Sequence, residues 1–476
     1  MSQRTDAGWN TGAAAPLCKG KPRAYLAVMI PTLAAIRFGT GLSPDLPSPA
    51  GANALLSRLG GADEMRAAFP IESWTARAIA IRDHGRLRRA RRDSDAANEA
   101  YRVADRALND GYHHDLRQTL SRAAMTRDGM RERLHWFWAG HFAVTEGRGA
   151  LRRNVGSYHD EAIRPYLTGD FATLLTSAVT HPAMVSYLDQ NKSMGPNSPR
   201  GRRGGGLNEN LAREVLELHT LGVGADYTQT DVRELAELLT GLDFDKAGQA
   251  RFTPNMAEPG AETVLGRSYG GDRPNRHDIT AVLRDLAVHP ATARHLSGKL
   301  AAHFVADVPP GDLVEAMAAT WLTTKGNLMA VYGAMLEHPA AWVPELRKVR
   351  RPLDMMAAAL RATGAGAALP DQTTRQIRKR VTEPLTAMGQ PWLRPAGPDG
   401  WPEEAEAWIT PQALAARLEW TMGLAGLLNP VPDPRAFVVQ ALGPLAGPRT
   451  VFAAEAAEDR IAGIALVLSS PEFQRR

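Results

Sequence analysis

The 476-residue sequence has one cysteine and no long apolar run. With Cys18 alone, neither an intramolecular disulfide nor a metal cluster built on several cysteines can form. No apolar stretch reaches the roughly 20 residues that a helix needs to span a bilayer. The sequence therefore predicts neither a disulfide scaffold nor a membrane-spanning helix.

One segment near the start superficially suits a signal peptide. The apolar residues 24–36 (AYLAVMIPTLAAI) follow Lys19, Lys21 and Arg23. No small-x-small cleavage site follows and no twin-arginine motif is present, and AAIRFGTGLSP reads as the start of a folded domain. We therefore expect residues 1–23 to be a disordered tail. The compartment is not identified; it is cytoplasmic by default, and export together with a partner stays open.

The excess of positively over negatively charged residues is also small. Lys and Arg number 56 against 51 Asp and Glu, a net charge of +5, which does not by itself indicate nucleic-acid binding. The arginine-rich segment 82–92 contains aspartates, so we interpret it as a solvated helix face with local ion pairs; an anion-binding ridge is the alternative. Nucleic-acid binding through 82–92 and 200–203 has only this charge in its favour.

What the sequence does have is helical periodicity. Residues 24–148 have a helical pattern, with apolar side chains at three- and four-residue spacing over 72–135, and helices are expected again from Pro411 to the end. Three histidine-proline pairs each follow an apolar run, and a degenerate copy ends the chain: His181-Pro182, His289-Pro290, His338-Pro339 and Ser470-Pro471. Proline suits the first helical turn and the residue before it suits a cap, so we predict recurring helix-turn-helix units capped by these histidines.

Two segments break the helical rhythm. Residues 242–272 suggest a short β-hairpin or an irregular lobe. Residues 364–402, around MGQPWLRPAGPDGWP, are expected to be loop-rich because four prolines exclude a continuous helix there. The expected fold class is mainly α: a multi-helix orthogonal array with repeated helix-turn-helix units and a small β-hairpin insertion. One helical domain over 24–476 is expected to have subdomains at about 24–241, 242–363 and 364–476.

The aromatic segment 134–142 (LHWFWAGHF) is expected to anchor the core, because aromatic side chains bury large apolar areas. His135 and His141 are six residues apart and do not share one helix face. Metal binding by this pair alone is therefore not expected.

The segment 184–241 has the most features that could carry chemistry. Its loop 195–206 is rich in Gly, Pro and Arg and must be non-helical. Asn208 suits a helix N-cap and Gly222 a helix end, so about four turns of helix are expected between them. Thr228 and Asp231 have capping-box spacing for a second helix.

A polar stripe on the first of these helices could form a site. It consists of Asn210, Arg213, Glu214 and Glu217. Two carboxylates three residues apart can hold a metal or divide acid and base roles, but Glu217 and His219 do not have the Glu-x-x-His spacing of di-iron bundles. No HExxH, Walker, nucleophile-elbow or Rossmann motif is present. An ion-pair network between two helices, centred on Arg213, explains the stripe without chemistry.

The candidate site residues follow from these patterns. The candidates for catalysis are Glu209, Arg213, Glu214, Glu217 and His219, and an enzyme would bring them to a pocket with Asp189 or His141. The candidates for binding are Asp189, Asn208, Asn210, Arg200, Arg202, Arg203 and Trp401. The sequence assigns no metal ligand, cofactor or oligomeric state.

Over nearly its whole length, the sequence resembles DUF1800, a bacterial family named for its unknown function. The resemblance includes RERLHWFWAGHFAV, HPAMVSYLD and, above all, LNENLAREVLELHTLGV, and it continues to the closing LSSPEFQRR. It implies a largely helical fold. It also implies a partner, because DUF1800 proteins are often encoded beside DUF1501 proteins, which resemble phosphatases and sulfatases.

Three positions depart from the pattern of that family. Gly140 stands where the family usually has Asn, Ala257 where it often has His, and Ala302 where it commonly has Arg. Each change removes a polar group. If those groups form a site in the family, this chain lacks part of it.

Two classes of function are compatible with these features. The first is a helical interaction or assembly partner of a DUF1501 (phosphatase/sulfatase-like) protein, with the loops 195–206 and 400–402 as contact surfaces. The alternative is a hydrolase or metal-dependent enzyme that uses the helix 208–220.

Overall fold

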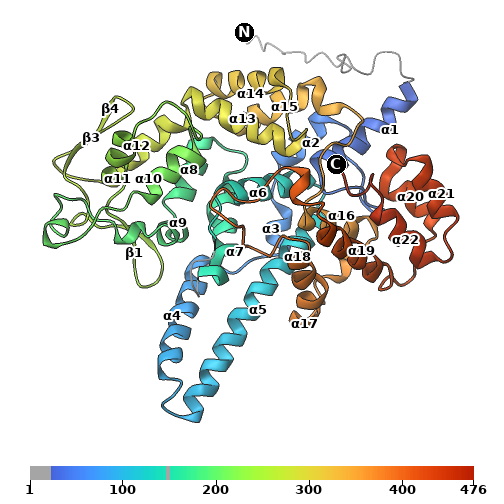
Figure 1. Ribbon diagram of the computed structural model, residues 1–476, viewed down its shortest axis with the longest axis horizontal. Helices are drawn as coiled ribbons and strands as arrows, with labels where there is room; N and C mark the ends of the chain where they lie inside the picture. Colours follow the sequence, from blue (N-terminus) through green and yellow to red (C-terminus); the bar gives the residue numbers. More distant parts are fainter. Residues whose placement is uncertain (1–22, 146–150) are drawn as a thin grey trace, which may run out of the picture.

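The computed structural model describes residues 23–145 and 151–476 (Figure 1). The predicted tail at 1–23 lies outside them, except for Arg23. The described part is mainly α-helical with two small antiparallel sheets, as the sequence predicts. None of the described helices is long and apolar enough to cross a membrane.

The first helices build the centre of the molecule. α1 (Arg23–Leu33) runs into a π-helical turn, Ala34–Phe38, whose side chains are all buried, as expected for the start of a folded domain. α6 (Gly129–His141) carries the aromatic segment, and its Leu134 and Trp138 are fully buried. The short helices around it are α2 (Ala52–Leu59), α3 (Glu64–Ala68), α7 (Val155–Tyr158), α8 (Phe171–Val179) and α9 (Pro182–Tyr187).

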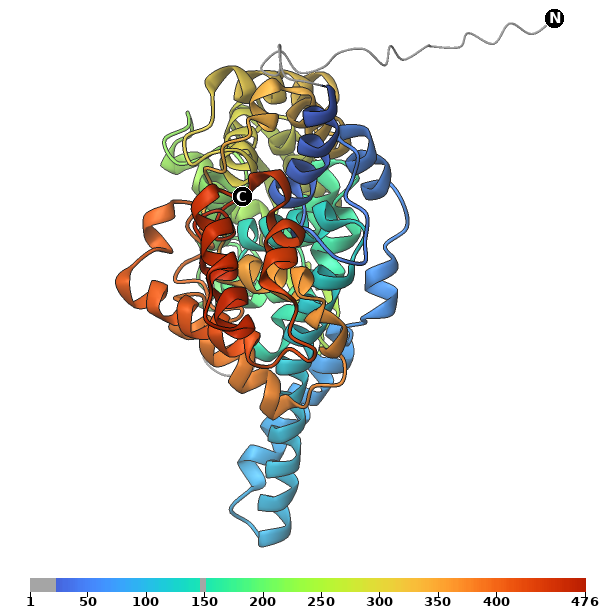
Figure 2. The same cartoon turned by 90° about the vertical axis from the view of Figure 1, so that its right-hand side faces the viewer.

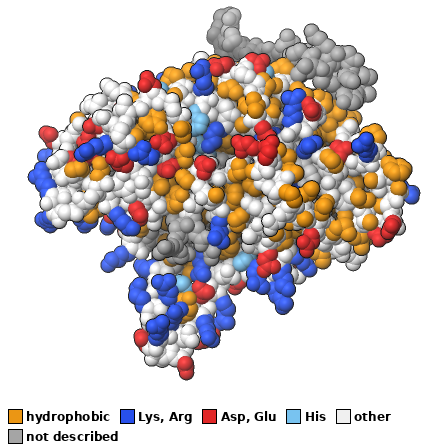
Figure 3. All heavy atoms as spheres, viewed as in Figure 1, with side chains coloured by type: hydrophobic (Ala, Val, Ile, Leu, Met, Phe, Trp, Pro, Cys, Tyr) orange, Lys and Arg blue, Asp and Glu red, His pale blue; other side chains and the backbone are white. Residues whose placement is uncertain are grey.

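α4 (Trp74–Ala90) and α5 (Asp95–Met125) form an arm that projects from this body (Figures 1 and 2). Lys and Arg side chains are frequent on its surface (Figure 3). Arg82 and Arg86 are more than half exposed, and each lies 3.5 Å from Asp83. The interpretation of 82–92 as a solvated helix face with local ion pairs is therefore confirmed.

The predicted break at 242–272 contains two hairpins. β1 (Leu242–Phe244) pairs with β2 (Ala250–Phe252), and β3 (Gly260–Val264) pairs with β4 (Arg267–Gly271). β3 packs against α11 (Gln229–Leu238) and β4 against α12 (Arg276–Ala287), and α10 (Asn210–Glu214) packs against α11. α11 begins with the predicted capping box of Thr228 and Asp231.

The histidine-proline pairs cap helical segments as predicted. In each of the three, His Nδ1 accepts the backbone N–H two residues later: His181 from Ala183, His289 from Ala291 and His338 from Ala340. The first two begin α9 and α13 (Pro290–Phe304), and the third begins a 3-10 turn, Pro339–Trp342. The fourth copy is different, because Ser470 follows α22 (Arg460–Ser469) and closes a turn by accepting the Phe473 N–H.

The expectation of a loop-rich segment over 364–402 is wrong for 374–387. That stretch is helical: α17 (Thr374–Ile377), a π-helical turn (Arg378–Thr382) and α18 (Glu383–Ala387). A capping box between Thr373 and Gln376 starts it. Ile377, Val381 and Leu385 recur every fourth residue and are buried, which holds it on the body.

The C-terminal half completes the array. α14 (Gly311–Thr323) packs against α13, α15 (Leu328–Glu337) packs against α14, and α16 (Pro352–Ala362) lies against α5. The last helices are α19 (Pro411–Ala425), α20 (Pro434–Leu442), α21 (Pro448–Glu455) and α22. The helix expected from Pro411 is confirmed. One apolar core extends from Met29 to Phe473, and the three-subdomain division stays a prediction.

Candidate functional site

The helix that carries most candidate residues differs in form from the one predicted. α10 covers only Asn210–Glu214 and continues as a π-helical turn, Val215–His219. Asn208 does not cap it; the Asn208 Oδ1 accepts the Asn210 N–H in a turn that precedes the helix. The predicted stop is present, because Gly222 has φ +97°.

Arg213 is the centre of the polar stripe. Its guanidinium donates to Glu209 (3.2 Å), to Glu217 (3.3 Å) and to Gln229 at the start of α11 (3.2 Å). The Arg213 side chain is 40% exposed. The ion pairs of the stripe thus lie within one helical segment near the surface, and among the described residues only hydrogen bonds to the neutral Gln229 join it to α11. The predicted ion-pair network between two helices is therefore wrong in this respect.

Two further candidates lie on the inner side of this helix. Glu214 is half-buried, and burial together with Glu217 and Asp399 raises its pKa. His219 is buried, with its ring centroid 5.8 Å from that of His141. His141 Nε2 donates to the His219 carbonyl oxygen, and Lys299 donates to His141 Nδ1. His219 therefore lies against His141 in the interior, and the pocket predicted to unite the candidates stays a prediction.

The binding candidates lie in two separate places. Arg200, Arg202 and Arg203 are exposed on the loop 195–206, which Asn197 fastens to Glu258. Asp189 is also exposed and pairs with a neighbouring lysine. Asn210 is exposed as well. Trp401 lies elsewhere, in a cavity.

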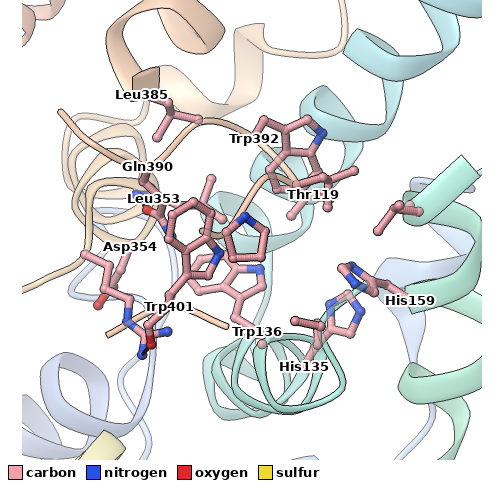
Figure 4. A pocket seen from close by; sticks show the side chains of 18 of the residues that line it. Thr119, His135, Trp136, His159, Leu353, Asp354, Leu385, Gln390, Trp392 and Trp401 are labelled. Carbon is pink, nitrogen blue, oxygen red and sulfur yellow. Dashed lines mark hydrogen bonds between the residues drawn. The ribbon is translucent and has the colours of Figure 1, made fainter. Parts of the chain in front are cut away.

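That cavity lies between α5, α6, α16 and the loop after α18 (Figure 4). We call it the tryptophan pocket, because Trp136, Trp392 and Trp401 line it. Its volume of about 80 Å³ is several times what one water molecule requires. Gly140 also lines it, whereas none of the five catalytic candidates does.

Several nitrogen atoms of the tryptophan pocket have no hydrogen-bond partner among the described residues. They are Nδ1 and Nε2 of His135, Nε2 of His159, and Nε1 of Trp136 and of Trp392. The two histidines lie side by side at one end of the pocket (Figure 4). Burial lowers the pKa of each to about 3, so both imidazoles are neutral near pH 7. Buried polar groups are nearly always paired, so these nitrogens indicate a place for a polar ligand or water.

Asp354 is the acidic residue of the pocket lining. Its carboxylate lies 3.3 Å from Arg133, 3.0 Å from Arg350 and 2.9 Å from Arg476. Burial alone would raise the pKa of Asp354, but the three guanidinium groups outweigh it and lower the pKa to about 2. The carboxylate is therefore ionised and forms ion pairs with three arginines.

Glu403 fastens the loop that carries Trp401. Its Oε1 lies 2.5 Å from Arg351 Nη2 and 2.7 Å from His303 Nδ1, and Lys348 lies 3.3 Å from Oε2. Burial would raise the pKa of Glu403, but these groups hold it well below its ordinary range. The loop therefore turns inward at Trp401, which faces the pocket (Figure 4). Pro402 is exposed, and the predicted contact surface at 400–402 stays a prediction.

The same loop needs glycine at position 400. Gly400 has φ +85°, and a Cβ there would collide with the carbonyl oxygen of Gly140 on α6. This close approach brings Trp401 against α6.

The sequence indicated only some of the residues in and around the pocket. The aromatic segment contains His135 and Trp136, but it was interpreted as core. Arg133, Asp354 and Glu403 lie far apart in the chain, and no motif joins them. A tryptophan in a glycine- and proline-rich loop was the one local signal; it pointed to Trp401, which lines the pocket, and a binding role for Trp401 stays a prediction.

A separate cluster of three carboxylates lies where β3 packs against α11. Oxygen atoms of Glu234, Glu237 and Glu262 are all within 4.8 Å of one another. Burial, together with the two neighbouring glutamates, raises the pKa of Glu262 to about 8. Glu262 therefore holds a proton near pH 7, which explains how the three groups can lie so close.

The proton on Glu262 predicts a dependence of stability on pH. An unfolded glutamate releases its proton near pH 4.5, whereas folded Glu262 keeps it until about pH 8. The folded state binds more protons between these values, so the free energy of unfolding should fall as the pH rises through this range. Glu262→Gln should remove this part of the slope and stabilise the protein at pH 8. Urea denaturation of both proteins from pH 5 to 8.5 checks it; parallel curves would contradict it.

Comparison with known proteins gives one match. A family model described as "Protein of unknown function (DUF1800)" matches residues 34–475. No curated protein and no solved structure matches the chain.

Proposed function

Since the chain belongs to the DUF1800 family of proteins of unknown function, we propose from its own geometry that it binds a small organic molecule in the tryptophan pocket. The observation that carries the proposal is the set of buried nitrogen atoms in the pocket that lack partners among the described residues. Ligand pockets typically combine apolar and aromatic walls with a few polar groups that fix orientation.

The surroundings of the pocket support a preformed site. Leu353, Leu385 and Leu393 add apolar wall to the three tryptophans. On one side, Tyr112 donates to the carbonyl oxygen of Trp392, and on the other, Arg351 donates to that of Trp401. The aromatic walls are thus held in place without a ligand, which lowers the cost of binding one.

Filling the pocket tests the proposal. Gly140 lies within α6, and a Cβ there would meet open space. Gly140→Leu is therefore expected to keep the protein folded, since leucine is the better helix former, and to occupy part of the pocket. Isothermal titration calorimetry of the full-length protein with benzoate and with benzamide should show binding of at least one of them, and Gly140→Leu should abolish it.

Gly85→Leu is the matched control. Gly85 also lies within a helix, α4, with open space around its Cβ position, and it does not line the pocket. Unchanged binding in Gly85→Leu supports the pocket as the site. Equal binding in wild type and Gly140→Leu, or no heat from either compound up to about 10 mM, would contradict the proposal.

The two functions suggested by the sequence stay predictions. What supports a protein partner is the exposure of Arg200, Arg202 and Arg203 on a loop fastened at its base. Deleting 195–206 and comparing pull-downs with a DUF1501 protein tests it. The hydrolase or metal-enzyme alternative has less support, because Glu209 and Glu217 are engaged by Arg213.

A further inference from the structure

We propose that the ligand of the tryptophan pocket is an organic oxyanion, a small carboxylate or phosphate ester, whose charged group lies beside Arg351. This inference rests on the proposed function and specifies the ligand class. It is carried by the balance of charge around the pocket and by one vacant guanidinium donor.

The lining of the pocket has more positive than negative side chains. Arg133, Arg351 and Arg476 line it, against Asp354 alone among the acidic side chains of the described lining. All four side chains are at least about nine-tenths buried. Asp354 pairs with Arg133 and Arg476, and Glu403 behind the lining pairs with Arg351. The three arginines still outnumber these two carboxylates, and unbalanced buried positive charge is costly, so an anion entering here would be favoured.

The next shell of residues does not remove this excess. Behind the lining, Arg350 and Lys348 add two cations, and Glu403 and Asp307 add two carboxylates. Glu403 and Asp307 are themselves in contact with Lys348. Burial, together with the neighbouring cations, lowers the pKa of Arg133, as expected where positive charges crowd together.

Arg351 offers the vacant donor. Its Nη2 donates to Glu403 and to the Trp401 carbonyl oxygen, whereas its buried Nε has no hydrogen-bond partner among the described residues. The side chain is 10% exposed and lines the pocket. A guanidinium N–H is a strong donor to carboxylate and phosphate oxygens.

The rest of the pocket fits the body of such a ligand. Asp354 and its ion pairs lie at one end of the pocket, His135 and His159 at the other, and Trp136 and Trp401 between them (Figure 4). An oxyanion on a small ring would place its charge at the arginine end. A hydroxyl or similar group at its far end could then meet the neutral imidazoles.

Matched charged and neutral probes test the inference on the unaltered full-length protein. Calorimetric titration with benzoate, phenyl phosphate and benzamide should give at least about tenfold tighter binding of one of the anions than of benzamide. Preference for benzoate or for phenyl phosphate distinguishes a carboxylate from a phosphate ligand. Equal affinity for all three would overturn the anion inference and leave the proposed function standing. No binding of any probe would overturn the proposed function, and this inference with it.

A variant at Arg351 tests where the charged group of the ligand lies. Arg351→Lys keeps the positive charge but removes Nε, and it should weaken anion binding about tenfold while benzamide binding changes little. Arg361→Lys is the matched control, because Arg361 is another buried arginine, bound to backbone carbonyls away from the pocket. Unchanged anion affinity in Arg351→Lys, or equal weakening in both variants, would overturn the placement of the oxyanion beside Arg351.

Discussion

Asp354→Asn is expected to lower the free energy of unfolding by about 2–5 kcal/mol, from the loss of its charge alone up to the usual cost of breaking a buried ion pair from one side. Asp354 is 3% exposed, and it is the shared partner of Arg133, Arg350 and Arg476. Asparagine has nearly the same shape but no charge. The variant therefore leaves three guanidinium groups buried together without their carboxylate. Urea denaturation at pH 7 measures the difference.

An exposed aspartate provides the control for this prediction. Asp189 pairs with Lys192 at 2.7 Å, but its side chain is 53% exposed. Its φ of +57° suits asparagine well. Asp189→Asn should therefore change stability by less than about 0.5 kcal/mol. Wild-type stability in Asp354→Asn, or an equal loss in both variants, would contradict the assigned role of Asp354.

Acid should destabilise the protein through two aspartates. Burial alone would raise the pKa of Asp63, but its hydrogen bonds and ion pair with Arg164 lower it to about 2, and the pKa of Asp354 is also about 2. In the unfolded chain both carboxylates take up protons near pH 3.8. The stabilisation is therefore complete above about pH 5 and is lost as the pH falls towards 2. Each group contributes about 2 kcal/mol.

Urea denaturation at pH 6, 4, 3 and 2 measures the loss. Asp354→Asn should show a shallower decline than the wild type, because one of the two groups no longer titrates. A free energy of unfolding that stays constant from pH 6 to pH 2 would contradict the assigned ion pairs.

The parts of the fold that the sequence predicted correctly depend on contacts within a few residues. The capping box of Thr228 and Asp231, the histidine caps before proline and the helix start at Pro411 are all local. Where local signals compete, the prediction was wrong. The prolines around 391–402 suggested a loop, although the buried series at Ile377 and Val381 makes the preceding stretch helical.

The helix that carries the catalytic candidates shows a second limit of predicting structure from sequence. Regular helical spacing predicted about four turns of α-helix. The segment Val215–His219 is instead a π-helical turn, in which the backbone hydrogen bonds join residues five apart and not four, so the turn contains one extra residue. This helps to separate the stripe around Arg213, which lies near the surface, from His219, which is buried. In this turn the His219 ring packs against His141 and Phe142, which are distant in the sequence.

The tryptophan pocket could not be predicted, because its polar groups meet only after folding. Arg133 comes from α6, Asp354 from α16, and Glu403 from the loop that follows α18. No spacing rule relates residues on three elements. Trp401 was selected for its loop, but its inward orientation depends on Glu403 and on the close approach of Gly400 to α6.

A crystal structure of the full-length protein grown with saturating benzoate tests the central claim most directly. We expect the ring to lie among Trp136, Trp392 and Trp401, with a carboxylate oxygen within hydrogen-bond distance of Arg351 Nε. Benzoate found only at the surface, or an empty pocket at saturation, would contradict it.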